Sequence, residues 1–155
     1  MKKDVCKYWM LVASKNHVTR GVNEGIAQVC HGKAQPLKRM KAGDGIIYYS
    51  PKIEFETNIA CQEFTALGFV SGDKIYSYDM GNGFIPYRIN IKYSKINPTS
   101  IKPLIPKLQF ITDQKKWGYK FRFGIFEISE MDFNLIAQEM KLNVGSGRGD
   151  ISKIS

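Results

Sequence analysis

The order of apolar and polar residues divides the chain into about six predicted strands and two or three short helices. Tyr8 to Ala13 is a nearly continuous apolar run of strand length, which predicts a strand buried on both faces. Tyr87 to Tyr93 alternates apolar and polar residues, which predicts a strand with one exposed face. Further strands are predicted at Gln28 to Gly32 (running into a loop), Ile46 to Tyr49, and Gln62 to Ile75 with a continuation over Lys74 to Asp79. The alternating rings of Tyr119 to Phe123 predict a strand or an extended segment.

Capping residues mark the predicted helices. Ser14 is placed to cap a helix that Gly25 ends. A second, basic helix is predicted over Leu37 to Lys41, because a proline just before it suits a first turn. Ser129 is expected to cap a third helix that continues to about Lys141 with an apolar stripe.

This order of elements, β-α-β-α-β-β-β-α, predicts an α+β fold built on a compact, partly open barrel of mixed type. Residues 1–142 are expected to form one domain, and 143–155, rich in Gly, Ser and charge, a flexible C-terminal tail. Prolines break Asn97 to Leu108 into a predicted loop with at most one helical turn. Met80 to Gly83 is expected to be a mobile linker by composition.

Positive charge is the strongest global feature of the sequence. The 155 residues carry a formal net charge of +9, and the 35-residue stretch from Arg88 to Arg122 holds nine Lys or Arg against one acid, Asp113. Surface cations favour phosphate backbones because they release condensed counterions. The charge therefore favours a nucleic-acid partner, and a solvated lysine-rich surface is the plainer alternative.

The cysteine content and the hydropathy of the sequence favour a cytoplasmic protein. Cys6, Cys30 and Cys61 are far apart and odd in number, which is typical of reduced thiols in a cytoplasmic protein. No apolar run approaches the roughly 20 residues of a membrane span, and no leader pattern precedes Tyr8, so neither a membrane partner nor export is expected.

Most catalytic and cofactor motifs are absent from the sequence. Cys30 and His31 have no further ligands at metal-binding spacing, and neighbours on a strand point to opposite faces, which disfavours a nucleophile pair. The Gly43-Asp44-Gly45 stretch lacks the spacing that wraps a phosphate chain. No cofactor or metal site is therefore predicted.

Aromatic residues interleaved with cations give a better candidate site. Bases stack on rings while cations hold phosphates, although a ring on an alternating strand is more often a core residue. Phe84 is different because Gly81 to Gly83 and Pro86 flank it, which indicates that it folds back over something. The free N–H groups at the helix that Ser14 caps would suit an anion or a carbonyl oxygen.

Several of these segments resemble a known family. The chain contains YWMLVASKNHVTRGV, AQVCHGKAQPLKRMKAGDGIIYYSPK, PYRINIKY and IKPLIPKLQFITDQKKWGYKFR, in that order from about Tyr8 to Met140. It resembles the EVE-domain family of the PUA-like superfamily, which is related to YTH and ASCH domains. The resemblance implies a PUA-like mixed β pseudo-barrel of about six strands with short flanking helices, and a pocket that accepts a flipped, modified base.

The resemblance also places a base pocket on this chain. Many YTH-like domains have a tryptophan in the second strand, where this chain has Ala27-Gln28-Val29, so one wall of an aromatic cage is expected to be missing. Methylated adenine, a modified cytosine or another base are all left open, in RNA or in DNA. The pocket residues predicted in this way are Ser14, Lys15, Asn16, Val29, Cys30, His31, Tyr49, Phe84 and Tyr87. The predicted phosphate-binding residues are Lys33, Lys38, Arg39, Lys115 and Lys116.

A non-catalytic module that binds nucleic acid is thus the predicted function. The alternative from the same resemblance is a small ASCH-like amidohydrolase acting on acylated nucleosides through a lysine, a hydroxyl and a carboxylate. The candidates for these groups are Lys15 or Lys33, Ser14 or Thr65, and Glu54 or Glu63. A structural or partner-binding role is the third possibility.

Overall fold

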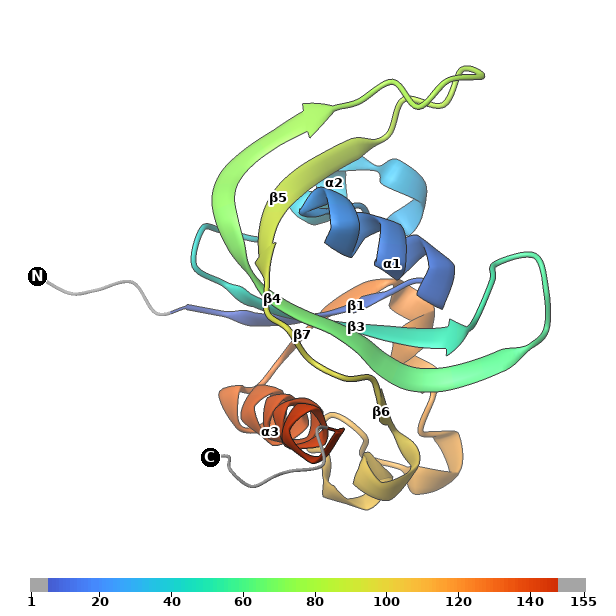
Figure 1. Cartoon of the computed structure of the whole chain (residues 1–155), viewed down its shortest axis with the longest axis vertical. Coiled ribbons are helices and arrows are strands. Elements are labelled where there is room, and N and C mark those ends of the chain that lie inside the picture. The colour runs from blue at the N-terminus through green and yellow to red at the C-terminus, as the bar shows by residue number, and fades with distance from the viewer. Residues whose placement is uncertain (1–5, 148–155) are drawn as a thin grey trace, which may run out of the picture.

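A curled seven-stranded mixed sheet forms the centre of the molecule (Figure 1). The computed structural model describes residues 6–147, with side chains for all of them except residues 73 and 142–147. The strands are β1 (Tyr8–Val12), β2 (Ile26–Ala27), β3 (Gly45–Lys52), β4 (Ala60–Ser77), β5 (Tyr87–Tyr93), β6 (Thr99–Ser100) and β7 (Ile125–Ile128). The described α-helices are α1 (Lys15–Glu24), α2 (Ala34–Leu37) and α3 (Glu130–Gly147), and the 3₁₀ turns are η1 (Cys30–Gly32), η2 (Lys102–Lys107), η3 (Gln114–Lys116) and η4 (Tyr119–Phe123).

The strand order is β2-β5-β4-β3-β1-β7, with β6 paired to β4. β1 runs parallel to β3, whereas the other pairs are antiparallel. The long strands β4 and β5 curve strongly, with α1 and α2 inside the curve and α3 on the other side of the sheet (Figure 1). This arrangement confirms the predicted mixed, partly open barrel.

The central strands bury both of their faces, as the continuous apolar run in β1 predicts. Trp9 and Leu11 pack into one cluster with Val18 of α1, whereas Met10 packs into the other with Ile136 of α3. The predicted helix after Ser14 is confirmed as α1: Ser14 Oγ accepts from the N–H of His17, and Gly25 ends the helix at a φ of 72°. This junction between β1 and α1 opens onto the candidate site.

The structure differs from the sequence prediction around the second helix and the second strand. α2 spans Ala34–Leu37 rather than Leu37 to Lys41, because Pro36 sits inside the first turn, where its missing N–H costs nothing. The predicted strand Gln28 to Gly32 is wrong: β2 is Ile26–Ala27, and the chain then turns sharply at η1. Both changes bring residues 29–32 to the surface of a cavity.

The aromatic segment Tyr119–Phe123 is also not a strand. It forms η4 between two glycines, because Phe121 turns inward to stack on Tyr49 with ring centroids 4.0 Å apart. The strand at this place is instead β7, which pairs antiparallel with β1 and which the sequence did not predict. The predicted loop over Asn97 to Leu108 contains β6 and η2.

The last helix is longer than expected. α3 is capped by Ser129, whose Oγ accepts from the N–H of Asp132 at 3.1 Å, as predicted. It continues through Gly147, so residues 143–147 of the predicted tail are helical, since an existing helix gains a hydrogen bond with each added residue. The rest of the predicted tail, 148–155, lies outside the described residues.

Candidate nucleic-acid interface

A cavity of about 840 Å³ opens where five segments meet. These are the start of α1, the turn η1, the β3–β4 turn (residues 53–59), the hairpin between β4 and β5 (residues 78–86), and η4. Among the described residues, its walls include Ser14, Asn16, His17, Arg20, Glu24, Gln28, Val29, Cys30, His31, Lys52, Glu54, Phe55, Met80, Phe84, Arg88, Phe121, Arg122 and Phe123.

Six of the nine predicted pocket residues line this cavity. They are Ser14, Asn16, Val29, Cys30, His31 and Phe84. Ser14 and Phe84 are 70 positions apart in the chain, and both line this one cavity. The two residues therefore face one space.

The other three predicted pocket residues lie elsewhere. Tyr49 is a core residue, stacked on Phe121 and buried, so it forms no wall. Lys15 points to Glu63, with Nζ 3.8 Å from Oε1. Tyr87 is exposed at the start of β5 and does not line the cavity.

The turn η1 has an unusual backbone. Cys30, His31 and Gly32 all have positive φ, at 49°, 62° and 84°, a region that costs a non-glycine residue free energy. The N–H of Gly32 donates to the carbonyl of Val29 at 2.9 Å. Within the described part of the chain, the N–H groups of Cys30 and His31 donate to no protein acceptor. Two backbone donors are thus available beside the cavity.

The helix N-terminus is less open than the sequence predicted. The N–H of Asn16 donates to the carbonyl of Ile53 at 3.0 Å, and that of His17 to Ser14 Oγ at 3.4 Å. The Asn16 amide also donates to Glu54 Oε2 at 3.0 Å. These bonds fasten the β3–β4 turn to α1, and they occupy the N–H groups of Asn16 and His17.

Aromatic rings from several segments surround the cavity. Phe84 comes from the β4–β5 hairpin, Phe121 and Phe123 from η4, and Phe55 from the β3–β4 turn. Phe55 meets the His31 ring edge-on, with centroids 5.9 Å apart. Where the sequence lacks a tryptophan near Ala27, rings from distant segments line the cavity instead. Sequence reasoning missed Phe55 as a site residue, because nothing near it in the sequence marks that proximity.

A buried arginine forms part of the cavity wall. Arg88 Nη1 lies 3.2 Å from Glu24 Oε1, and its guanidinium lies 4.2 Å from the centre of the Tyr78 ring. In the amide orientation that satisfies both partners, Gln28 Oε1 accepts from Arg88 Nη2 at 2.7 Å and from Nε at 3.2 Å. Arg88 is therefore fully engaged and holds β5 to α1 and to the segment after β2.

Burial lowers the pKa of His17 below its usual value, and Arg20 lowers it further. A hydrogen bond to the Gln28 backbone opposes this shift. His17 is therefore a neutral imidazole at neutral pH, and it lines the cavity without adding charge.

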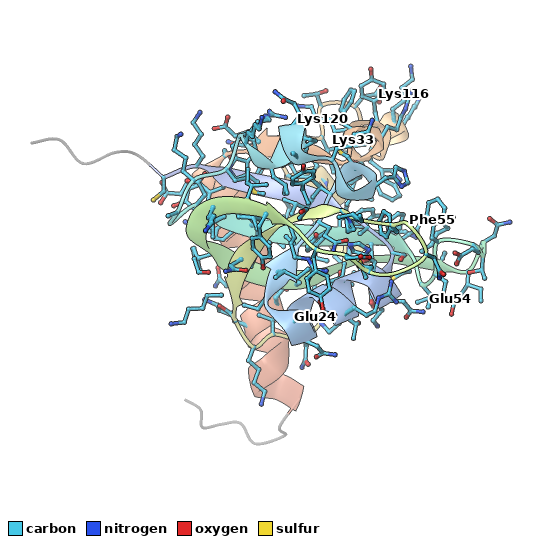
Figure 2. All side chains as sticks on the ribbon, turned by 90° about the horizontal axis from the view of Figure 1, so that it is seen from above. Glu24, Lys33, Glu54, Phe55, Lys116 and Lys120 are labelled. Carbon is cyan, nitrogen blue, oxygen red and sulfur yellow. The ribbon has the colours of Figure 1, made fainter. Side chains whose placement is uncertain are left out.

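Three exposed lysines gather on one side of the molecule, whereas the cavity lining itself holds both signs of charge, with Arg20 and Lys52 beside Glu24 and Glu54. In Figure 2, Lys33, Lys120 and Lys116 lie along one side of the molecule, and Glu24 and Glu54 lie on the other. The five predicted phosphate-binding residues, Lys33, Lys38, Arg39, Lys115 and Lys116, are all exposed, and none lines the cavity itself. The cation nearest in sequence to the η1 turn is Lys33.

The alternative chemistries find little support in the geometry. No cluster of three His, Cys, Asp or Glu side chains suited to a metal occurs among the described residues. The lysine, hydroxyl and carboxylate of the amidohydrolase alternative do not meet in the cavity: Ser14 and Glu54 line it, whereas Lys15 and Lys33 do not. Thr65 hydrogen-bonds to Ser50 at 2.7 Å, away from the cavity. No helix in the described structure is long and apolar enough to cross a membrane.

Comparison with known proteins identifies relatives by sequence and by fold. The UPF0310 protein in the gntR 5′ region of Bacillus licheniformis is 51% identical over 127 residues, covering 82% of this chain and 86% of that protein. The UPF0310 protein msl3206 of Mesorhizobium japonicum is 47% identical over 135 residues, covering 86% and 91%.

Solved structures share the fold at low identity. The YTH domain-containing protein mmi1, solved with RNA, has a TM-score of 0.60 at 12% identity, covering 94% of this chain and 87% of that chain. The YTH domain of Zygosaccharomyces rouxii MRB1, solved with N6-methyladenosine RNA, has a TM-score of 0.58 at 14% identity, covering 90% and 89%. These likenesses confirm the PUA-like fold. The EVE domain model matches residues 7–139, and the chain therefore belongs to the EVE-domain family.

Proposed function

We propose that the protein is a non-catalytic nucleic-acid-binding module that holds a flipped, modified base in the cavity. The observation that carries this proposal is the cavity itself, where Ser14, Asn16, His31 and Phe84 meet beside a basic surface. Its volume of about 840 Å³ lies in the range of roughly 300–1,000 Å³ that is usual for small-molecule sites. A nucleobase with its sugar fits such a volume.

The walls offer both kinds of contact that a flipped base needs. Removing a base from its stack costs a few kcal/mol, which ring stacking and hydrogen bonds to the base edge offset. Phe84 supplies a ring for stacking in the same cavity as Ser14 and Asn16. The hydroxyl of Ser14, the amide of Asn16 and the free N–H groups of Cys30 and His31 supply the polar contacts.

The rest of the strand would follow the basic side of the molecule. Lys33 and Lys120 lie on that side, and Arg122 lines the cavity (Figure 2). Glu54 on the opposite side repels phosphates, so the charges favour a path for the strand along the basic side. The YTH neighbours solved with RNA support the same partner class.

Fluorescence anisotropy with labelled oligonucleotides tests this function. RNA and DNA strands carrying N6-methyladenine, 5-methylcytosine or no modification are titrated over a range of salt. We expect one modification to bind more tightly than its unmodified control, and Phe84→Ala to reduce that preference about tenfold or more. Tyr87→Ala, an exposed ring outside the cavity, is the matched control and should retain it. Equal binding of every strand at every salt concentration would contradict the proposal.

The non-catalytic part of the proposal has its own test. Incubation with N4-acetylcytidine, followed by chromatography, should release no cytidine. Turnover that Lys15→Ala abolishes would support the amidohydrolase instead.

The free thiols of Cys6, Cys30 and Cys61 support a cytoplasmic location, which stays a prediction.

A further inference from the structure

The hairpin between β4 and β5 ends in an exposed apolar finger, residues 78–86. Figure 1 shows it projecting beyond the sheet, past α1 and α2. Tyr78, Met80, Phe84 and Ile85 are all exposed there, Ile85 by 53%. A Cβ at Gly81 or at Gly83 would meet nothing within 4 Å, so the tip is slender and open. Exposed apolar residues gathered in one place mark an interaction site.

The finger is held in place at its base. The N–H of Tyr78 donates to the carbonyl of Pro86 at 3.0 Å, and that of Met80 to Phe84 at 2.9 Å. The Arg88 guanidinium packs over the Tyr78 ring and is itself bonded to Glu24. The apolar side chains are therefore presented on an ordered support, so binding would cost little conformational entropy.

The finger also borders the base cavity. Met80 and Phe84 line the cavity, whereas Ile85 does not. The finger carries no Lys or Arg, and Asp79 uses its carboxylate to accept from the N–H of Gly81 at 2.8 Å. An almost uncharged apolar tip suits the interior of a base stack, and Lys33, which follows the Gly32 that packs against Pro86, suits a phosphate.

Building on the base-binding function above, we propose that Ile85 is a wedge that enters the base stack of double-stranded DNA beside the flipped base. Apolar side chains of this kind insert between base steps and open them. A base that leaves a duplex vacates a gap that a neighbouring wedge can fill. Single-stranded RNA needs no such wedge because its bases are already unstacked. The finger thus points to duplex DNA as the substrate class.

Duplex and single-stranded binding of the full chain tests the wedge. DNA strands with one 5-methylcytosine or one N6-methyladenine are compared with the same strands in duplex form, with 2-aminopurine next to the modified base to report opening of the stack. We expect tighter binding to one duplex than to its single strand. Ile85→Ser should weaken duplex binding about tenfold, abolish the 2-aminopurine signal, and leave single-strand binding within about twofold.

Ile59→Ser is the matched control, because Ile59 is a 62% exposed isoleucine outside the cavity. Thermal melting of each variant verifies folding. Single strands bound as tightly as duplexes, or equal effects of the two substitutions, would overturn the wedge while the base-binding function stands. Binding to modified RNA but not to modified DNA would also overturn the wedge and leave the base-binding function standing. Absence of binding to any nucleic acid would overturn both.

Discussion

Gly32 lies where two walls of the cavity touch. It ends the strained turn η1 at a φ of 84°, and a Cβ there would lie 2.9 Å from Pro86 Cα and closer still to Pro86 Cβ. The absence of a side chain lets the turn and the finger touch. The two cavity walls that carry His31 and Phe84 are therefore joined at this point.

Gly32→Ala should lower the free energy of unfolding by about 3 kcal/mol, the sum of left-handed backbone strain and overpacking. Gly81→Ala is the control, because Gly81 also has positive φ but open space around it. Gly81→Ala should lower the free energy of unfolding by only about 1 kcal/mol. Urea denaturation measures both values. Equal losses would mean that the contact with Pro86 contributes nothing.

His17 makes stability depend on pH. Its pKa in the folded protein is lower than the usual 6.5, so the unfolded chain binds the proton more readily. Stability from the neutral imidazole is therefore complete above about pH 6.5 and is lost as the pH falls toward the folded-state pKa. Between about pH 7 and about pH 5, His17→Gln should show a smaller fall in the free energy of unfolding than the native chain. Parallel curves for the two proteins would contradict this assignment.

At the level of elements, Asp44 joins β1 to the turn before β3. Its buried carboxylate accepts from the N–H of Lys7 at 3.1 Å, from the Trp9 indole at 2.9 Å and from the N–H of Lys41 at 3.0 Å. The strands are parallel neighbours, so no hairpin links them directly. Asp44 therefore fixes where β1 enters the sheet, and with it the position of Ser14.

Asp44→Ala should destabilise the protein by about 3 kcal/mol, because three buried or part-buried donors lose their acceptor. The control is Asp113→Ala: Asp113 also accepts a backbone N–H, from Lys115 at 3.0 Å, but it is exposed. Its cost should stay below about 1 kcal/mol. Chemical denaturation that gives the two variants equal midpoints would contradict the role of Asp44.

Local patterns explain which elements could be predicted from the sequence. β5 and β1 could be predicted from the strict alternation of Tyr87–Tyr93 and from the apolar run that begins at Tyr8. Each pattern is a direct consequence of which side chains are buried. The alternating rings of Tyr119–Phe123 led to a wrong strand prediction. Phe121 instead turns inward to stack on Tyr49, a residue far from it in the sequence. β7 was missed because its four residues carry no pattern of their own.

The same distinction applies to the cavity. Ser14 was predicted from its capping position and Phe84 from its Gly-rich surroundings, and both are local signals. Arg88, Phe55 and Arg122 reach the cavity only through the curl of the sheet and the turns around it. Nothing near them in the sequence indicates that proximity. Tyr49 was wrongly placed in the pocket, because β3 buries both of its faces and the Tyr49 ring lies in the core.

At the level of the whole molecule, the exposed lysines on one side predict how binding responds to salt. Lys33→Ala and Lys120→Ala should each reduce the slope of log K against log[salt] by about 1, because each removes one phosphate contact. Lys107→Ala is the control: it lies in η2, at the other end of the molecule from the finger (Figure 1). A slope that changes equally for all three variants would show only a general effect of net charge.

Backbone amide NMR of the full chain, titrated with the tightest-binding oligonucleotide, tests the central claim most directly. If the cavity holds the base, the largest shifts should fall on Asn16, Cys30, His31 and Phe84, which come from three separate segments. Large shifts confined to α3 or β6, with the cavity amides unchanged, would contradict the account.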